Sequence, residues 1–208
     1  PRLRPWLASA RFIASIPIHW RDYSPARVYR DLIVNVVFLG APSTGKTTLA
    51  EALARELDTV WMPEYGREYW EAHQRDRRLS PDQLVELAEG HLAREEALLQ
   101  EANGVLFTDT NALTTYVFGG YYHGCVAPRL ALLAATAERR YDLVFVCNTD
   151  IPYDDTWDRS GQANRDVFQK RIVADLHRRR VPYLLLSGEL EKRIEHVKGV
   201  LAVYQKYS

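Results

Sequence analysis

The sequence has little cysteine, no long apolar run and no excess of charge, and each absence excludes a class of protein. Two cysteines in 208 residues, Cys125 and Cys147, cannot form a disulfide framework, and this composition suits a reducing cytoplasm. No apolar run approaches the roughly 20 residues that a membrane-spanning helix needs. Basic and acidic residues number 27 each, so charge gives no reason to expect nucleic acid or a membrane surface as a partner.

The first 30 residues differ in composition from the rest of the chain. They begin at Pro1, without a methionine or the pattern of a signal peptide, which suggests a piece of a longer protein. Prolines interrupt the stretch, while aromatic residues could anchor it to a domain. Residues 1–30 are therefore interpreted as an extension, either packed on the domain that follows or ending one that precedes it. Residues 31–208 are long enough to form one domain with a substantial core.

The most informative stretch is Gly40-Ala41-Pro42-Ser43-Thr44-Gly45-Lys46-Thr47, which fits the phosphate-binding pattern G-x-x-x-x-G-K-[ST]. An apolar, β-branched run precedes it at 32–39, and apolar residues at helical spacing follow it. A strand, a glycine-bounded loop and a helix are the context in which backbone amides bind phosphate. The stretch from Gly40 to Thr48 is thus predicted to bind ATP, with Lys46 on its β- and γ-phosphates and Thr47 as a Mg²⁺ ligand.

Strand-like and helix-like segments alternate along the rest of the chain. A strong helix start at Ser80-Pro81-Asp82-Gln83 opens a long amphipathic segment, on which His91 is expected to be a core residue. The predicted fold is a three-layer α/β sandwich around a parallel sheet of about five strands. The expected strands are 32–39, 58–64, 105–107, 141–148 and 181–186, and the later helices are 127–140, 165–180 and 189–207.

Two carboxylates follow predicted strands and should lie at the carboxyl edge of the sheet, where open α/β folds bind ligands. Glu64 ends the second strand, although a solvated turn would explain it as well. Asp109 ends the third strand, as the Mg²⁺-supporting residue of a P-loop protein does. The crowded aromatic residues of 114–122 fit either core packing or a substrate-stacking surface.

A polar loop, Thr149 to Asn164, follows the fourth predicted strand and is rich in charge. Arginines in such a loop suit a lid that closes over transferring phosphates, although a solvated loop has the same composition. Arg159 and Arg165 are the candidates for stabilising charge on the transferring group.

Four segments together resemble the ribosylnicotinamide kinase domain of the bifunctional NadR-type family. They are the P-loop, Pro63-Glu64-Tyr65-Gly66-Arg67-Glu68-Tyr69, Phe107-Thr108-Asp109-Thr110 with Thr114-Thr115, and Asp158-Arg159 with Arg165 and Phe168-Gln169. The resemblance covers roughly residues 33–207. An adenylyltransferase domain precedes the kinase in that family, and residues 1–30 look like a version of its tail, but the nucleotide-binding motifs of that domain are not recognisable here.

The resemblance implies transfer of a phosphoryl group from ATP to nicotinamide riboside, with Mg²⁺, in NAD biosynthesis or salvage. It favours Glu64 as the base and Asp109 as the support of Mg²⁺ through water, with the reverse assignment open. Arg67 would orient Glu64 or the substrate. Other residues expected at the substrate are Tyr65, Tyr69, Asn111, Tyr116 and Trp157, with the aromatic rings stacking on the cationic pyridinium. Two alternatives stay open: a kinase for another nucleoside or nucleotide, and a nucleotide-sensing module without turnover.

Overall fold

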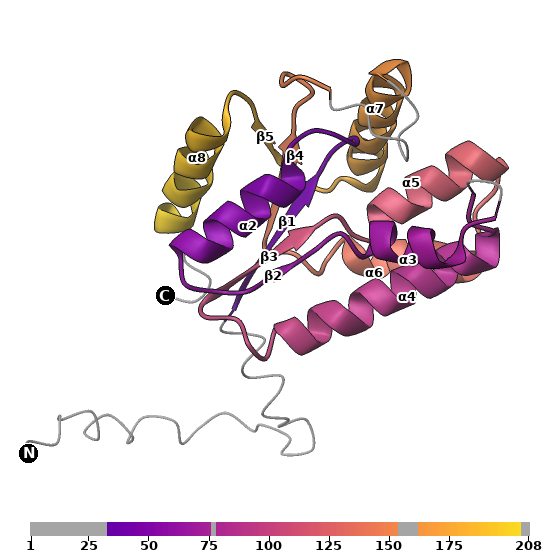
Figure 1. The fold of residues 1–208 in the computed structure, drawn as a ribbon, viewed down its shortest axis with the longest axis horizontal. Coiled ribbons are helices and arrows are strands. Elements are labelled where there is room, and N and C mark those ends of the chain that lie inside the picture. The colour runs from indigo at the N-terminus through magenta and orange to yellow at the C-terminus, as the bar shows by residue number, and fades with distance from the viewer. Residues whose placement is uncertain (1–32, 76–77, 154–161, 205–208) are drawn as a thin grey trace, which may run out of the picture.

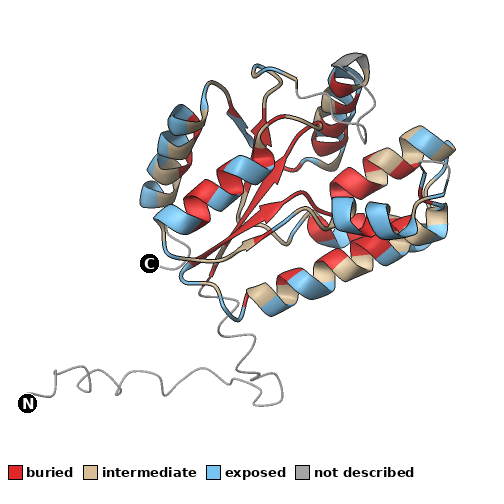
Figure 2. Cartoon of the chain, viewed as in Figure 1, coloured by how far each residue is buried: buried red, intermediate tan, exposed pale blue. Residues whose placement is uncertain are grey.

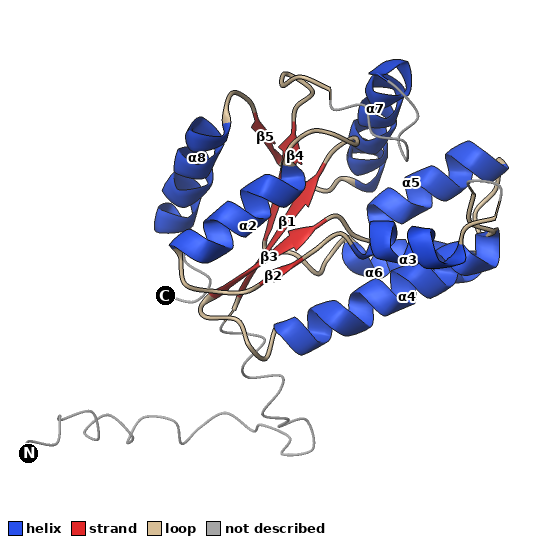
Figure 3. Ribbon diagram, in the orientation of Figure 1, coloured by secondary structure: helices blue, strands red, loops and turns tan. Residues whose placement is uncertain are grey.

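The structure, a computed structural model, describes residues 33–75, 78–153 and 162–204. Its centre is a five-stranded sheet of order β2-β3-β1-β4-β5, in which every neighbouring pair is parallel (Figures 1 and 3). The strands are β1 (Val34–Leu39), β2 (Trp61–Met62), β3 (Val105–Asp109), β4 (Leu143–Cys147) and β5 (Leu184–Leu186). The predicted α/β architecture, with a parallel sheet of about five strands, is confirmed.

Helices cover both faces of this sheet. The helices are α2 (Lys46–Glu56), α3 (Tyr65–His73), α4 (Pro81–Leu98), α5 (Ala112–His123), α6 (Pro128–Ala137), α7 (Gln162–Arg179) and α8 (Leu190–Val203). Helices α2 and α8 pack on one face, and α5, α6 and α7 pack on the other. Helix α4 packs against α3 and α6 at the β2 side, so this side carries a second small core.

Burial on both faces explains the apolar run that forms β1. Val36 and Phe38 face α2 and α8, whereas Val37 and Leu39 face α5, α6 and α7, and all four side chains are fully buried. Figure 2 shows the central strands as the most continuously buried part of the chain. A strand covered on both faces needs apolar residues without alternation, which is the pattern in the sequence.

The structure differs from the sequence-based prediction in the bounds of several elements, and β2 is only Trp61–Met62 of the expected 58–64. Residues Tyr65–His73 form α3, where only a strand end and a loop motif were expected. Helix α7 begins at Gln162 rather than at Arg165. Strand β5 begins at Leu184, because Pro182 has no amide hydrogen to donate to a ladder. The capping box at Ser80 is confirmed, since its hydroxyl accepts from the Gln83 amide and its own amide donates to the Gln83 side chain.

Some predictions concern residues outside the described part of the chain. They are the role of residues 1–30 as an extension, the stacking role of Trp157 and the lid role of Arg159. Among the described residues, no helix is both long and apolar enough to cross a membrane.

Candidate active site

The P-loop joins β1 to α2 with a backbone that needs its glycines. Gly40 has a φ of +141°, and a Cβ atom there would lie 2.7 Å from the carbonyl oxygen of Cys147 on β4. Gly45 has a φ of +78° and is the N-cap of α2. Side chains with a Cβ rarely adopt these angles, so both positions of the sequence pattern are explained by the backbone. The loop therefore ends at a helix N-terminus, where a phosphate is stabilised.

Carbonyl groups of the loop accept hydrogen bonds from cationic side chains. Lys46 Nζ donates to the Ala41 oxygen at 2.9 Å. Arg165 Nη2 donates to the Ser43 oxygen at 2.9 Å, and Arg193 Nη1 donates to the Thr44 oxygen at 2.6 Å. A loop held through its carbonyl groups can direct amide groups at an anion.

Arg165 is placed differently from the lid position that its sequence context predicted. Its side chain is buried, with 3% of the residue exposed, and its Nη2 also donates to the Ile151 oxygen at 2.9 Å. Burial lowers the pKa of this guanidinium from its usual value. The reason is that the first turn of α7, which contains Arg165, lies against the P-loop. Arg165 therefore binds the backbone of the P-loop instead of extending over it from a lid.

Asp109 and Thr47 meet because β3 lies beside β1. Phe38 pairs with Asp109 in the register of these strands, which brings the carboxylate to the first turn of α2. Thr47 Oγ1 donates to Asp109 Oδ2 at 2.5 Å, whereas Oδ1 is buried without a hydrogen-bond partner among the described residues.

This pair fits a magnesium ion bound mainly through phosphate and water. Within the described ranges, no group of three or more His, Cys, Asp or Glu side chains could hold a metal by itself. Mg²⁺ at phosphate-transfer sites commonly uses one or two protein ligands, with phosphate oxygens and water completing the octahedron. A hydroxyl and a carboxylate with an unpaired oxygen match that requirement, so the expectation for Thr47 and Asp109 stands as a proposal.

Glu64 lies on the neighbouring strand of the same sheet edge. Strand β2 pairs with β3 through Met62 and Thr108, and Glu64 follows β2 as the N-cap of α3. Glu64 is half-buried, and its negative charge raises the pKa of the Asp109 carboxyl. The two carboxylates predicted from separate motifs are therefore brought together.

The pKa of the Asp109 carboxyl is raised from 3.8 to about 6, chiefly by burial. The negative charge of Glu64 raises it further. The charges of Lys46 and Arg67 and the hydrogen bond from Thr47 lower it. These opposing influences show that the P-loop lysine, both carboxylates and Arg67 form one electrostatic site, with Arg67 on its exposed side.

Tyr69 and Tyr65 pack between α3 and α4 instead of lining the site. Tyr69 is buried, its hydroxyl donates to Glu86, and its ring stacks on His73 at 4.1 Å. Burial and the Glu86 carboxylate raise its pKa to about 12. The Tyr65 ring lies under the Arg94 guanidinium at 4.0 Å. The predicted stacking role of Tyr69 is corrected to helix packing, because α3 turns this residue toward α4.

Tyr116 lies at the far end of α7 from the P-loop. Its ring contacts the guanidinium groups of Arg178 and Arg179, at 5.8 and 4.5 Å from the ring centroid. Those residues are about 20 Å along the helix axis from Arg165, at 1.5 Å per residue. Tyr116 lines a surface groove of about 610 Å³ beside α7, so its predicted contact with substrate is corrected.

Asn111 is the N-cap of α5, with its Oδ1 accepting from the Leu113 amide at 2.9 Å. The residue is only 3% exposed and holds the turn after Asp109, while its Nδ2 has no hydrogen-bond partner among the described residues, so its place at the substrate stays a prediction. Asn is a favoured residue at this position because its short side chain satisfies an amide of the first helical turn.

Sequence reasoning missed two residues that shape the P-loop. Arg193 on α8 is 2% exposed and binds the Thr44 oxygen. Gln169 on α7 accepts from the Ala41 amide at 2.8 Å and donates to the Cys147 oxygen at 3.0 Å. Gln169 belonged to a recognised motif, which was a usable signal, whereas the sequence around Arg193 offers none.

Two half-buried aromatic residues near 114–122 pack against α7, whereas Tyr122 is 40% exposed. Phe118 and Tyr121 contact the fully buried Phe168 of α7 at ring-centroid distances of 4.4 and 4.6 Å. This contact joins α5 to α7 beside the P-loop. Of the two explanations that the sequence left open, helix packing accounts for Phe118 and Tyr121.

Residues 35–193 match the AAA_28 family, whose description is AAA domain. The chain is 29% identical over 182 residues to the trifunctional NAD biosynthesis/regulator protein NadR of Escherichia coli (strain K12), covering 83% of this chain and 43% of that protein. It is 29% identical over 199 residues to the protein of the same name from Salmonella typhimurium (strain LT2), covering 89% of this chain and 47% of that protein. The chain thus spans less than half the length of these relatives.

Solved structures with a similar fold include two of NadR. The structure of NadR in complex with NR superposes with a TM-score of 0.71 at 24% identity, over 88% of this chain and 54% of that chain. The structure of NadR in complex with NAD and AMP-PNP superposes with a TM-score of 0.67 at 26% identity, over 85% of this chain and 51% of that chain. The structure of deoxyadenosine kinase from M. mycoides superposes with a TM-score of 0.51 at 13% identity, over 81% of this chain and 98% of that chain. The chain therefore belongs to the AAA_28 family of P-loop domains and is similar in sequence and fold to the kinase-type region of NadR proteins.

Proposed function

We propose that this chain transfers the γ-phosphoryl group of ATP to the 5′-hydroxyl of nicotinamide riboside, giving nicotinamide mononucleotide and ADP. The observation that carries the proposal is the convergence of two carboxylates, Glu64 and Asp109, with Lys46 and Thr47 of the P-loop. A site that only binds nucleotide needs the loop, whereas phosphoryl transfer also needs a group that faces an acceptor.

The P-loop side of the site supports ATP. The amide groups of the loop, the N-terminus of α2 and Lys46 would hold the phosphate oxygens. Mg²⁺, held by Thr47 and through water by Asp109, would neutralise charge on the β- and γ-phosphates. Catalysis of this kind depends on positioning and on charge stabilisation more than on covalent chemistry.

The acceptor side supports Glu64 as the proposed base. Asp109 is fully buried and its Oδ2 accepts the Thr47 hydrogen bond, which favours a role at the metal. Glu64 is half-buried at the end of β2 and lies on the same sheet edge, where a hydroxyl can approach. Arg67 follows one turn later and would orient Glu64 or the substrate.

The relatives support this choice of reaction. Both matched relatives are named as NAD biosynthesis proteins, and one NadR structure is described as a complex with NR. Another holds NAD and AMP-PNP, and the latter is an ATP analogue. Since those proteins are about twice as long, we also propose that the full-length protein carries an additional domain, of the adenylyltransferase type. We further propose that it acts in the cytoplasm, because its low cysteine content suits a reducing compartment.

The testing experiment measures ADP release from Mg-ATP with and without nicotinamide riboside, beside a panel of nucleosides and nucleoside monophosphates. We expect stimulation by the riboside and a product with the mass of nicotinamide mononucleotide. Stimulation by a different acceptor alone would replace the substrate and keep the reaction. ATP binding without stimulation by any acceptor would contradict the kinase proposal and favour a nucleotide-sensing module.

A further inference from the structure

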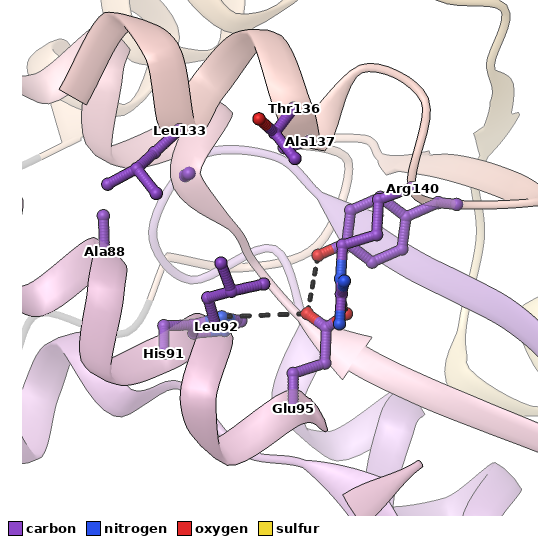
Figure 4. Close-up of a pocket in the computed structure, with 10 residues that line it drawn as sticks. Ala88, His91, Leu92, Glu95, Leu133, Thr136, Ala137 and Arg140 are labelled. Atoms are coloured by element: carbon purple, nitrogen blue, oxygen red, sulfur yellow. Dashed lines mark hydrogen bonds and ion pairs between the residues drawn. The ribbon is translucent and has the colours of Figure 1, made fainter. Parts of the chain in front are cut away.

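A buried polar cluster lies behind the end of β3 and takes no part in the proposed transfer. It consists of His91 and Glu95 on α4, Arg140 after α6 and Tyr141 before β4, and is called the Glu95 cluster below. Figure 4 shows the side chains of His91, Glu95 and Arg140 pointing toward one another around a small cavity. Glu95 is only 1% exposed, which is rare for a carboxylate unless it is paired.

Both oxygens of Glu95 are used within the cluster. Oε1 accepts from Arg140 Nε, and Oε2 accepts from the Tyr141 hydroxyl at 2.7 Å. His91 Nδ1 lies 3.8 Å from Oε2. Burial and the Glu95 charge raise the pKa of Tyr141 well above its usual value, so its hydroxyl stays a donor. Burial lowers the pKa of His91, so its imidazole is neutral near pH 7.

The cavity between these groups has room for one water molecule. Its volume is about 20 Å³, and His91, Glu95, Arg140 and Tyr141 are among its lining residues. A water needs roughly 10–15 Å³ and two to four polar partners. His91 Nε2 and Arg140 Nη2 are both buried without a hydrogen-bond partner among the described residues, and a water here would serve both.

The cavity connects the Glu95 cluster to the turn after β3, because Ala112, the first residue of α5, is also among its lining residues. The pKa values of two cluster residues respond to the same turn. Burial has the largest effect on both, but the Asn111 side chain lowers the pKa of Tyr141 and the Asp109 backbone raises the pKa of His91. The Glu95 cluster therefore lies against the segment Asp109-Thr110-Asn111.

That segment needs external support because Thr110 has a φ of +64°. A β-branched residue is strained in the left-handed region and keeps that conformation only where its surroundings enforce it. The strained turn aims Asp109 at Thr47 and starts α5 at Asn111. The backbone angle and the buried cluster are independent observations that meet at one turn.

We propose that Glu95 is a positioning residue for the phosphoryl-transfer site. Together with the other side chains that line the cavity beside Ala112, it holds the strained turn after β3, and with it the direction of the Asp109 carboxylate. The inference rests on the proposed function for its kinetic consequence, although the restraint on the turn is a property of the fold itself.

Three variants of the full chain test the inference: Tyr141→Phe, Glu95→Gln and the control Glu96→Gln. Tyr141→Phe removes one hydroxyl and leaves the Arg140–Glu95 pair intact. Glu96 is adjacent on α4, accepts from the same arginine at 2.7 Å and has a side chain that is 44% exposed. The measurements are hydrogen–deuterium exchange at residues 110–113, the melting temperature, kcat, and KM for ATP and for the acceptor.

We expect Tyr141→Phe and Glu95→Gln to speed exchange at 110–113 and to lower kcat by about threefold to tenfold, the value of one hydrogen bond. KM for ATP should stay near the wild-type value, and Glu96→Gln should change none of these quantities. Should Glu95→Gln fail to fold, Tyr141→Phe decides alone. A folded Tyr141→Phe variant with unchanged exchange at 110–113 would overturn the inference, whatever its melting temperature. If the wild-type chain turns over no acceptor, the proposed function fails and the exchange comparison still decides this inference.

Discussion

Arg193 Nη1 donates a hydrogen bond of 2.6 Å to the main-chain oxygen of Thr44, so the last helix of the domain holds its first loop. The same guanidinium donates to the Gly188 oxygen at 2.7 Å and to Asp150 Oδ1 at 2.6 Å. Asp150 in turn accepts from the Gly188 amide at 2.6 Å. The loops after β4 and β5 and the P-loop therefore share one buried cation.

Replacing Arg193 by Gln should loosen the P-loop and destabilise the fold. The loss leaves the Thr44 and Gly188 oxygens and the partly exposed Asp150 without this donor, and a buried group left unpaired costs about 1–3 kcal/mol. We expect a lower melting temperature and a higher KM for ATP, measured by thermal unfolding and steady-state kinetics. The matched control on α8 is Lys198→Gln, which breaks an exposed pair with Glu56. Such exposed pairs contribute about 0–1 kcal/mol to stability. An equal fall in melting temperature in Arg193→Gln and Lys198→Gln would therefore contradict the role assigned to Arg193.

Lys46→Ala should abolish most turnover without unfolding the domain. The Lys46 side chain binds the Ala41 oxygen within the loop and carries the positive charge expected at the phosphates. By analogy with the loss of one transition-state donor, kcat should fall about 100-fold or more. Steady-state ADP release gives the effect, and circular dichroism checks the fold. Near-normal turnover by a folded Lys46→Ala variant would show that the loop is not the ATP site.

Glu64→Gln should separate catalysis from nucleotide binding. If Glu64 is the base, kcat should fall about 100-fold while ATP binding is retained. The control is Glu68→Gln, one turn further along α3, where an exposed carboxylate pairs with Arg94. Single-turnover kinetics and nucleotide titration measure the two effects. Unchanged turnover in Glu64→Gln would transfer the role of base to Asp109.

Asp109→Asn should raise stability at neutral pH and remove activity. The pKa of this carboxyl is about 6 in the folded chain against 3.8 for an unperturbed aspartate, so its ionisation destabilises the fold as pH rises through that range. The Asn variant should therefore gain up to about 3 kcal/mol at pH 7.5 and little near pH 4. Thermal unfolding in the absence of Mg²⁺ at several pH values measures the gain. A gain that does not change with pH would mean that the charge of Asp109 is not its source.

The pH dependence of wild-type turnover should also report the titration of the Asp109 carboxyl. As pH falls through about 6, Asp109 becomes protonated and loses its affinity for a cation. Because a bound cation favours the ionised form, the acid limb of the kcat/KM profile should move to lower pH when Mg²⁺ is raised. An acid limb that is insensitive to Mg²⁺ would assign it to another group.

Local backbone chemistry explains why the sequence alone located the P-loop, Asp109 and the alternation of strands and helices. Gly40 and Gly45 occupy angles that other residues avoid, and Asp109 ends an apolar run that only a doubly covered strand accommodates. These features depend on residues close together in the chain. Glu64 was located as well, since a carboxylate after a strand must lie at the ligand-binding edge.

Tertiary packing alone decided which polar and aromatic side chains face the site. Tyr69 belongs to the same motif as Glu64, yet α3 directs it to Glu86 on α4. Arg165 and Arg193 reach the P-loop from 122 and 149 residues away. Helical spacing shows which residues share a face of a helix, but the element packed against that face determines whether they meet substrate, another helix or a loop carbonyl. The sequence thus determined the chemistry available to this protein, and the folded chain determined where each group is used.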